Sequence, residues 1–229
     1  MTECAVLGGC SSTHAAQSST QLTTGPRAGE GESLVAQARG RQLAVFPQLG
    51  SRQFTLLLAS PNHWGTPLVL LVVEDRGAWL KALLPVRPNG SEGWIRESDV
   101  TLSKHAYRIR IELQAHRITV LHHGRVLLQE PVAVGTLQTP TPGGQYYTTD
   151  LLKQPNPIGP YGPYAYGLSG YSRVLTEFGG GDGQLGLHGT NDPASLGTDV
   201  SHGCIRMSNA GITRLAGLLP LGVPVEVDP

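Results

Sequence analysis

The chain has 229 residues, of which 30 are glycine and 17 are proline, and its 17 Lys and Arg residues balance its 17 Asp and Glu residues. A nucleic-acid-binding protein normally has a surplus of basic residues to neutralise phosphates, so the zero formal charge argues against that class. The hydrophobic content of 39% is too high for a disordered chain. The many glycines and prolines disfavour a helical bundle, and no apolar run is long enough for a membrane span. We therefore expect an all-β protein, mostly strands with one or two short helices.

Residues 1–39 are rich in Ser, Thr, Gly and Ala, and we interpret them as a disordered leader or linker. Within this segment, Leu7-Gly8-Gly9-Cys10 resembles a bacterial lipobox, in which the cysteine becomes acylated. Only nine residues precede Cys10 and none is Lys or Arg, whereas an export signal has a basic segment and an apolar stretch. Two alternatives stay open: the true start lies upstream and Cys10 carries a lipid anchor, or the match is due to chance.

Residues 40–103 form the second expected unit, a small β-barrel. Apolar runs at 54–58 and 68–73 are bounded by turn-forming residues, and two more strands are expected at 78–84 and 93–95. The order of residues from 77 to 102, with Trp79 and Trp94 each beside a turn, resembles a bacterial SH3-like module. The simpler alternative is that both tryptophans serve only as core aromatics.

Residues 104–229 form the third expected unit, and its strand signal is stronger. Residues 107–113 alternate polar and apolar side chains, as a half-buried strand does. A glycine-, proline- and tyrosine-rich stretch at 155–171 predicts a long loop, and a helix is expected after Ser208 or Asn209. Its apolar face would hold Ile212, Leu215 and Leu219, and further strands are expected at 117–121, 126–128, 132–135, 145–149 and 223–227.

One cysteine of the three, Cys204, stands among histidines in this third unit, with His188 sixteen residues before it and His202 two residues before it. A thiol is mostly protonated at neutral pH and needs a neighbouring base to become a nucleophile, which a histidine can supply. Gly203 lets the backbone approach a substrate, and amides beside it are candidate oxyanion donors. Arg206 carries a planar cation that suits a carboxylate.

Other interpretations of these residues stay open. A single cysteine is often only a packed apolar residue, and Arg206 alone is often a surface charge. His188, His202 and Cys204 together are also a candidate zinc site, which would need a fourth ligand or a bound water.

The segments His188-Gly189-Thr190 and Ser201-His202-Gly203-Cys204-Ile205-Arg206-Met207 carry a family resemblance. They resemble the signature of the L,D-transpeptidases with a YkuD-type catalytic domain, and the similarity extends over about 105–228. The resemblance implies a β-sandwich-like catalytic domain that follows the SH3-like barrel.

The resemblance also implies roles for the residues of the motif. Cys204 would be the nucleophile and His188 the general base, oriented by the carbonyl of Gly189. His202 would lie beside the thiol, and Ser201 and Gly203 would shape the oxyanion site. Arg206 would order the loop or bind a substrate carboxylate, and Tyr164 and Tyr166 are candidate contacts for the substrate.

The implied reaction is cysteine acyl transfer through a thioester, without metal or cofactor. Peptidoglycan stem peptides would be donor and acceptor, giving 3→3 crosslinks, or an amine of a lipoprotein would be the acceptor. The resemblance also implies inhibition by carbapenems and a location outside the cytoplasmic membrane, at the cell wall. The only membrane link that we expect is a lipid anchor on Cys10, if the lipobox-like segment is a true one. The alternative function is that of a catalytically inactive cell-wall-binding protein.

Overall fold

The structure is a computed structural model that describes Met1 and residues 31–177 and 181–229. The lipobox-like segment with Cys10 lies outside these residues. Strands dominate the described chain, which contains one α-helix, so the expectation of a mostly β protein is confirmed. In this part of the chain no helix combines the length and apolar character needed to cross a bilayer.

The N-terminal region contains a five-stranded antiparallel sheet of order β6-β5-β4-β1-β7 and a separate β2-β3 pair. Strand β1 lies inside the range assigned to the leader, and it pairs with both β4 and β7, so the folded region begins before residue 40. The reason is that this short segment is almost wholly buried between two neighbouring strands. The bounds are β1 Ser33–Ala38, β2 Gln42–Val45, β3 Leu56–Ala59, β4 Val69–Asp75, β5 Trp79–Leu83, β6 Glu92–Arg96 and β7 Val100–His105, with a 3-10 turn at Glu97–Asp99.

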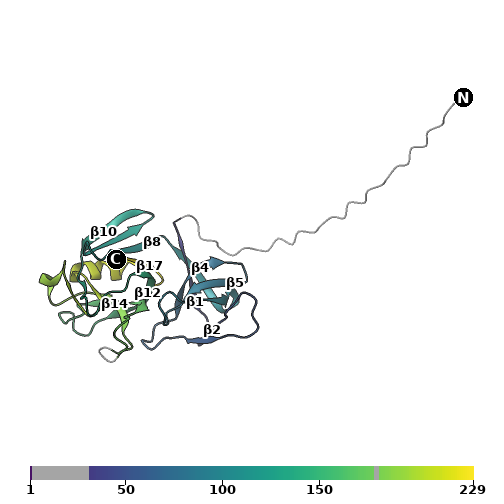
Figure 1. Cartoon of the computed structure of the whole chain (residues 1–229), viewed down its shortest axis with the longest axis horizontal. Helices are drawn as coiled ribbons and strands as arrows, with labels where there is room; N and C mark the ends of the chain where they lie inside the picture. The colour runs from purple at the N-terminus through teal and green to yellow at the C-terminus, as the bar shows by residue number, and fades with distance from the viewer. Residues whose placement is uncertain (2–30, 178–180) are drawn as a thin grey trace.

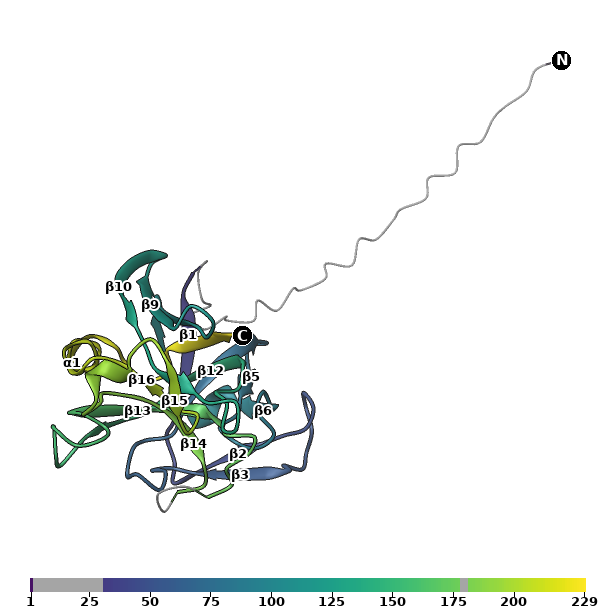
Figure 2. The ribbon, with the colours of Figure 1, turned by 60° about the vertical axis from the view of Figure 1, so that its left-hand side comes forward.

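The C-terminal region contains an eight-stranded mixed sheet of order β10-β9-β8-β17-β12-β13-β14-β16 (Figures 1 and 2). The β17–β8 and β14–β16 pairs are parallel and the other pairs are antiparallel. A short parallel pair, β11–β15, lies beside it. The bounds are β8 Tyr107–Glu112, β9 Arg117–His122, β10 Arg125–Pro131, β11 Val134–Gly135, β12 Gly144–Lys153, β13 Tyr164–Tyr171, β14 Gln184–His188, β15 Asp199–Ser201, β16 Ile205–Arg206, α1 Asn209–Leu218 and β17 Pro224–Asp228, with a 3-10 turn at Pro193–Ser195.

One face of this sheet packs against α1. Ile109 and Ile111 of β8 point into the same core as Ile212 and Leu215 of the helix. Ser208 caps the helix, since its hydroxyl accepts a hydrogen bond from the Gly211 amide at 2.9 Å. The predicted helix start and its apolar face are therefore confirmed.

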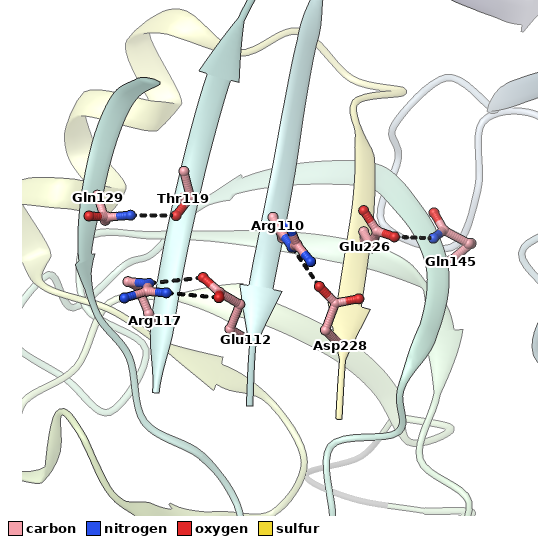
Figure 3. A network of polar contacts seen from close by, with 8 residues as sticks. All are labelled: Arg110, Glu112, Arg117, Thr119, Gln129, Gln145, Glu226 and Asp228. Atoms are coloured by element: carbon pink, nitrogen blue, oxygen red, sulfur yellow. Dashed lines mark hydrogen bonds and ion pairs between the residues drawn. The ribbon is translucent and has the colours of Figure 1, made fainter. Parts of the chain in front are cut away.

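The opposite face of the sheet carries a ladder of polar pairs that crosses five strands (Figure 3). The Arg117 guanidinium donates twice to the Glu112 carboxylate, at 2.8 Å each, and Arg110 donates to Asp228 at 2.6 Å. Gln129 donates to Thr119 at 3.0 Å and Gln145 to Glu226 at 3.2 Å, so each neighbouring pair from β10 to β12 is bridged. Polar residues on alternate positions explain why this face is solvated while the helix covers the other.

The predicted loop at 155–171 is wrong in its second half, because β13 occupies residues from Tyr164 onward. This strand pairs with β12 on one side and with β14 on the other. Its glycines, which suggested a loop, serve close packing: a Cβ at Gly170 would overlap the ring of Tyr146. Tertiary contact thus overrides the local turn signal.

The two regions pack against each other beside β12 (Figure 1). Tyr147 of β12 is fully buried in the core of the N-terminal region. Arg87 donates to the carbonyls of Ser172 at 2.6 Å and Asp182 at 2.7 Å. The N-terminal region is therefore bound to the segment that follows β13. We propose that residues 40–103 belong to an SH3-like unit, whose sheet also includes β1 and continues through β7 to His105.

Candidate active site

The parallel strands β14 and β16 bring the two predicted reactive residues together. Leu187 pairs with Ile205, and both side chains are fully buried in the core. Because side chains alternate along a strand, His188 and the residues flanking Ile205 project from the other face. Cys204 immediately precedes β16 and lies against Gly186, two residues before His188 on β14.

Gly186 leaves open the space between the thiol and the imidazole. A Cβ at this position would lie 3.6 Å from Sγ of Cys204 and 3.6 Å from Cδ2 of His188. The sulfur and the Nε2 side of the ring therefore border the same space above β14. Proton transfer from a thiol to an imidazole needs the two groups to face a common space of this kind.

The His188 ring is held in a defined tautomer. Its side chain is buried, and Nδ1 lies 2.6 Å from the carbonyl oxygen of Gly189. A carbonyl only accepts hydrogen bonds, so Nδ1 carries the proton and Nε2 presents a lone pair. Burial is the main cause that lowers the pKa of His188 to about 4, and the charge of Arg206 lowers it further. The imidazole is therefore neutral near neutral pH and able to accept a proton.

Cys204 is also neutral at rest. Burial raises the pKa of its thiol above the ordinary value, while a hydrogen bond from the Gly186 backbone and the positive charge of Arg206 act in the opposite direction. The resting pair is consequently a thiol and a neutral imidazole rather than a thiolate and an imidazolium. Arg206 favours the thiolate once it forms.

The loop before Cys204 is fixed by one buried side chain. The Ser201 hydroxyl donates to the carbonyl of Cys204 at 2.6 Å and accepts from the amide of Gly203 at 3.0 Å. Gly203 has φ +112°, a conformation that favours glycine, and its carbonyl accepts from Thr141 at 2.9 Å. The Gly203 amide is thus bonded within the loop, which supports an orienting role for Ser201 and Gly203.

A cleft of about 250 Å³ opens beside the thiol and the imidazole. Tyr161 stands at its edge, 40% exposed, with its ring centroid 4.8 Å from that of His188 and edge-on to it. Among the described residues, those that line the cleft are Trp64, Leu152, Gln154, Tyr161, Ala165, Tyr166, Gly167, Gly181, Asp182, Gly183, Gln184, Leu185, Gly186, His188 and Cys204.

The other predicted site residues lie in different surroundings. Tyr166 borders the cleft, but its side chain is fully buried and its hydroxyl donates to the Leu215 carbonyl at 3.0 Å. Tyr164 is half-buried against the core and, through its carbonyl, accepts from the Gly189 amide at 3.3 Å. His202 is exposed and is not part of the described cleft lining. The roles first assigned to these three residues stay predictions.

Several residues of the site had no signal in the sequence. Gly186 borders both reactive side chains only because β14 and β16 meet here. Tyr161 belongs to the tyrosine-rich loop that was predicted to contact the substrate, but its ring contact with His188 was not predicted. Asn209 accepts from the Thr190 amide at 2.8 Å, and Gly189 packs so closely on it that any Cβ would overlap the amide oxygen. Trp64 comes from the N-terminal region, which no motif linked to the site.

A metal centre would need more ligands than the site offers. Within residues 31–177 and 181–229, no group of three or more His, Cys, Asp and Glu side chains is arranged to hold a metal ion. The zinc alternative for His188, His202 and Cys204 therefore lacks a ligand set.

A half-buried thiol that shares a cleft with an oriented neutral imidazole is typical of a cysteine-dependent enzyme. Residues 106–227, more than half of the chain, match the family model of the L,D-transpeptidase catalytic domain, YkuD. The chain belongs to this family of cysteine transpeptidases.

The chain is also similar to individual proteins. Over 123 residues the chain is 37% identical to "Putative L,D-transpeptidase YkuD" of Bacillus licheniformis, and over 122 residues it is 38% identical to the protein of the same name in Bacillus subtilis. These matches cover 54% and 53% of this chain and 66% of each relative, just under two thirds of their length. A crystal structure of L,D-transpeptidase 3 from Mycobacterium tuberculosis with a faropenem-derived adduct matches 71% of this chain and 91% of its own, with 15% identity and a TM-score of 0.47.

Proposed function

We propose that this protein is a peptidoglycan L,D-transpeptidase that forms 3→3 crosslinks by cysteine acyl transfer. The observation that carries the proposal is the pairing of Cys204 with His188 above Gly186, with Nδ1 of the imidazole bonded to the Gly189 carbonyl. This tautomer directs the basic nitrogen away from the backbone and leaves it to the thiol.

Acylation begins when a stem peptide presents an L,D peptide bond to Cys204. The sulfur attacks the carbonyl carbon while its proton passes to Nε2 of His188. The bond to the terminal D-residue breaks, and the imidazolium returns the proton to the leaving amine. A thioester on Cys204 remains.

Deacylation uses the same two residues in reverse. The amine of a second stem attacks the thioester carbonyl and gives its proton to His188, and the departing thiolate takes a proton back. An amine of a lipoprotein would react in the same way. The cationic Arg206 stabilises the thiolate and is suited to a substrate carboxylate.

The cellular setting belongs to the same proposal. The substrate lies outside the cytoplasmic membrane, so the enzyme would act at the cell wall, held there by a lipid on Cys10 if that segment is a true lipobox. A carbapenem would acylate Cys204, since a strained lactam carbonyl is open to attack by the same thiol.

Product analysis tests this function. Purified protein is incubated with a disaccharide tetrapeptide, and the masses of the separated products are measured by mass spectrometry. We expect a dimer that has lost one terminal D-residue, and none with Cys204→Ala. Release of the D-residue without a dimer would indicate hydrolysis and contradict transfer.

A further inference from the structure

The cleft at Cys204 is completed by a residue from outside the catalytic region. Of the described residues that line it, all lie between 152 and 204 except Trp64, which belongs to the N-terminal region. Its side chain is 47% exposed. A half-exposed indole in the cleft that also contains the thiol offers an apolar face to a ligand that enters the cleft.

Hydrogen bonds of the Asn62 side chain fix the turn that carries Trp64. The side-chain oxygen of Asn62 accepts from the amides of Trp64 and Thr66, at 3.0 Å each. The side-chain amide of Asn62 in turn donates to the buried carboxylate of Asp150 on β12. The turn is therefore linked by a hydrogen bond to β12 of the catalytic sheet.

The indole itself is anchored by Gln184 at the start of β14. Its N–H donates to the side-chain oxygen of Gln184 at 3.3 Å. The side-chain nitrogen of Gln184 donates to Thr149 and to the Leu168 carbonyl, at 3.0 Å each, which fixes the orientation of the amide group. Gln184 lies on the same strand as His188, so the indole is positioned relative to the catalytic base.

We propose that Trp64 binds the acyl donor, with its indole packing against apolar parts of the stem peptide while Cys204 attacks. This inference rests on the proposed function and names a substrate contact for it. The N–H is already bonded to Gln184, so the contribution to binding comes from the ring face. An aromatic anchor with its polar atom satisfied loses little conformational entropy when a ligand packs on it.

Kinetics with two reagents separate binding from structure. The tetrapeptide donor must occupy the cleft that Trp64 and Cys204 line, whereas iodoacetamide needs only the thiol. With Trp64→Ala we expect KM for donor acylation to rise about tenfold with kcat nearly unchanged. Alkylation of Cys204 by iodoacetamide, read on the peptide that contains it, should stay within about twofold of the unmodified protein.

Two further variants sharpen the result. Trp64→Phe keeps an aromatic face and should restore most of the affinity for the donor. Phe54→Ala removes another aromatic of the N-terminal region, 52% exposed and not part of the described cleft lining, and should change neither rate.

The possible outcomes separate failure of the Trp64 inference from failure of the proposed transpeptidase function. If the unmodified protein is acylated by the donor and Trp64→Ala behaves like Phe54→Ala, the inference is overturned and the function stands. An equal loss with donor and iodoacetamide would assign Trp64 a structural role and also overturn it. A wild-type protein that neither binds nor is acylated by the donor would overturn both.

Discussion

The protonation states of His188 and Cys204 determine how the site begins a reaction. Burial lowers the pKa of the imidazole to about 4 and raises that of the thiol. Neither group is charged near neutral pH, and Arg206 opposes an imidazolium while it favours a thiolate. The resting site therefore holds no stable ion pair, and the thiol must lose its proton before or during the attack.

This predicts the pH dependence of thiol reactivity. The base form of His188 persists down to its pKa of about 4, so no inflection is expected at the ordinary value of 6.5. The thiolate fraction should grow by about tenfold per pH unit up to the raised pKa of Cys204. Iodoacetamide labelling of Cys204 should thus rise steadily from about pH 6 to about pH 9. Cys204→Ala serves to subtract labelling elsewhere. A plateau near neutrality would contradict this prediction, because it would mean that the thiol reacts without prior loss of its proton to solvent, either from a preformed thiolate–imidazolium pair or by proton transfer to His188 during the attack.

Gly189 offers a test of how the imidazole is oriented. A Cβ there would overlap the Asn209 side-chain oxygen and lie 3.0 Å from Cα of Gly162, so the backbone carbonyl that holds His188 must move. We expect Gly189→Ala to slow donor acylation of Cys204 by at least about tenfold. In the control Gly217→Ala, an exposed helix position with open space, acylation should be unchanged and the helix stabilised by about 0.5–1 kcal/mol. Equal acylation rates in the two variants would contradict this role.

The motif residues were predictable from the sequence because His188 and Cys204 stand in short segments with a recognisable order. The surroundings that set their properties were not. Gly186 and Tyr161 reach the pair through strand register and loop packing, and no local pattern encodes either contact. Tyr166, a predicted substrate contact, borders the cleft, and its hydroxyl also ties β13 to α1, a contact that the sequence did not indicate.

At the scale of elements, α1 supports the active site through its first residues. Ser208 caps the helix and also donates to both carboxylate oxygens of Glu130, at 3.1 Å each. The next residue, Asn209, holds the Thr190 amide close to His188. The helix start thus connects β10 with the segment that follows the catalytic base.

Removal of this cap should weaken the whole C-terminal region. We expect Ser208→Ala to lower the free energy of unfolding by about 1–2 kcal/mol, measured by urea denaturation. Thr213→Ala, an exposed position on the same helix, should change it by less than about 0.5 kcal/mol. Similar losses in both variants would mean that the cap contributes nothing specific.

Elements were predictable where local pattern and tertiary environment agree. The alternation in 107–113 and the apolar face of α1 are such cases, and both are confirmed. β13 was missed because Gly167 and Gly170 resemble loop residues until their neighbours are known. β16 has two residues, too few for any periodicity, and only its parallel pairing with β14 defines it.

For the whole molecule, Arg87 is the clearest link between the two regions. Its guanidinium donates to the carbonyls of Ser172, Leu175 and Asp182 and lies 4.8 Å from the centre of the Tyr171 ring. Asn89 adds a reciprocal pair of hydrogen bonds with the backbone of Tyr171, at 2.8 and 2.9 Å. Such long-range pairing has no sequence signature, which is why the expected separate units gave no hint of a shared cleft.

Loss of the Arg87 guanidinium should weaken the contact between the N-terminal and C-terminal regions. We expect Arg87→Ala to destabilise the protein by about 2 kcal/mol, because three carbonyls lose a charged donor. All three tryptophans lie in the N-terminal region, so their fluorescence during urea unfolding follows that part, and far-UV circular dichroism follows the whole. The two probes should coincide in the unmodified protein and diverge with Arg87→Ala. Arg76→Ala, an exposed ion pair with Glu74, should have no measurable effect. Coincident, unshifted transitions with Arg87→Ala would contradict this link.

The central claim, that Cys204 is the nucleophile and His188 its base, is tested most directly by intact-mass measurement after incubation with a carbapenem. We predict a single covalent adduct located on Cys204, its absence with Cys204→Ala, and formation slowed by about 10²-fold or more with His188→Ala. An adduct that survives Cys204→Ala, or that forms at the wild-type rate without His188, would contradict the account.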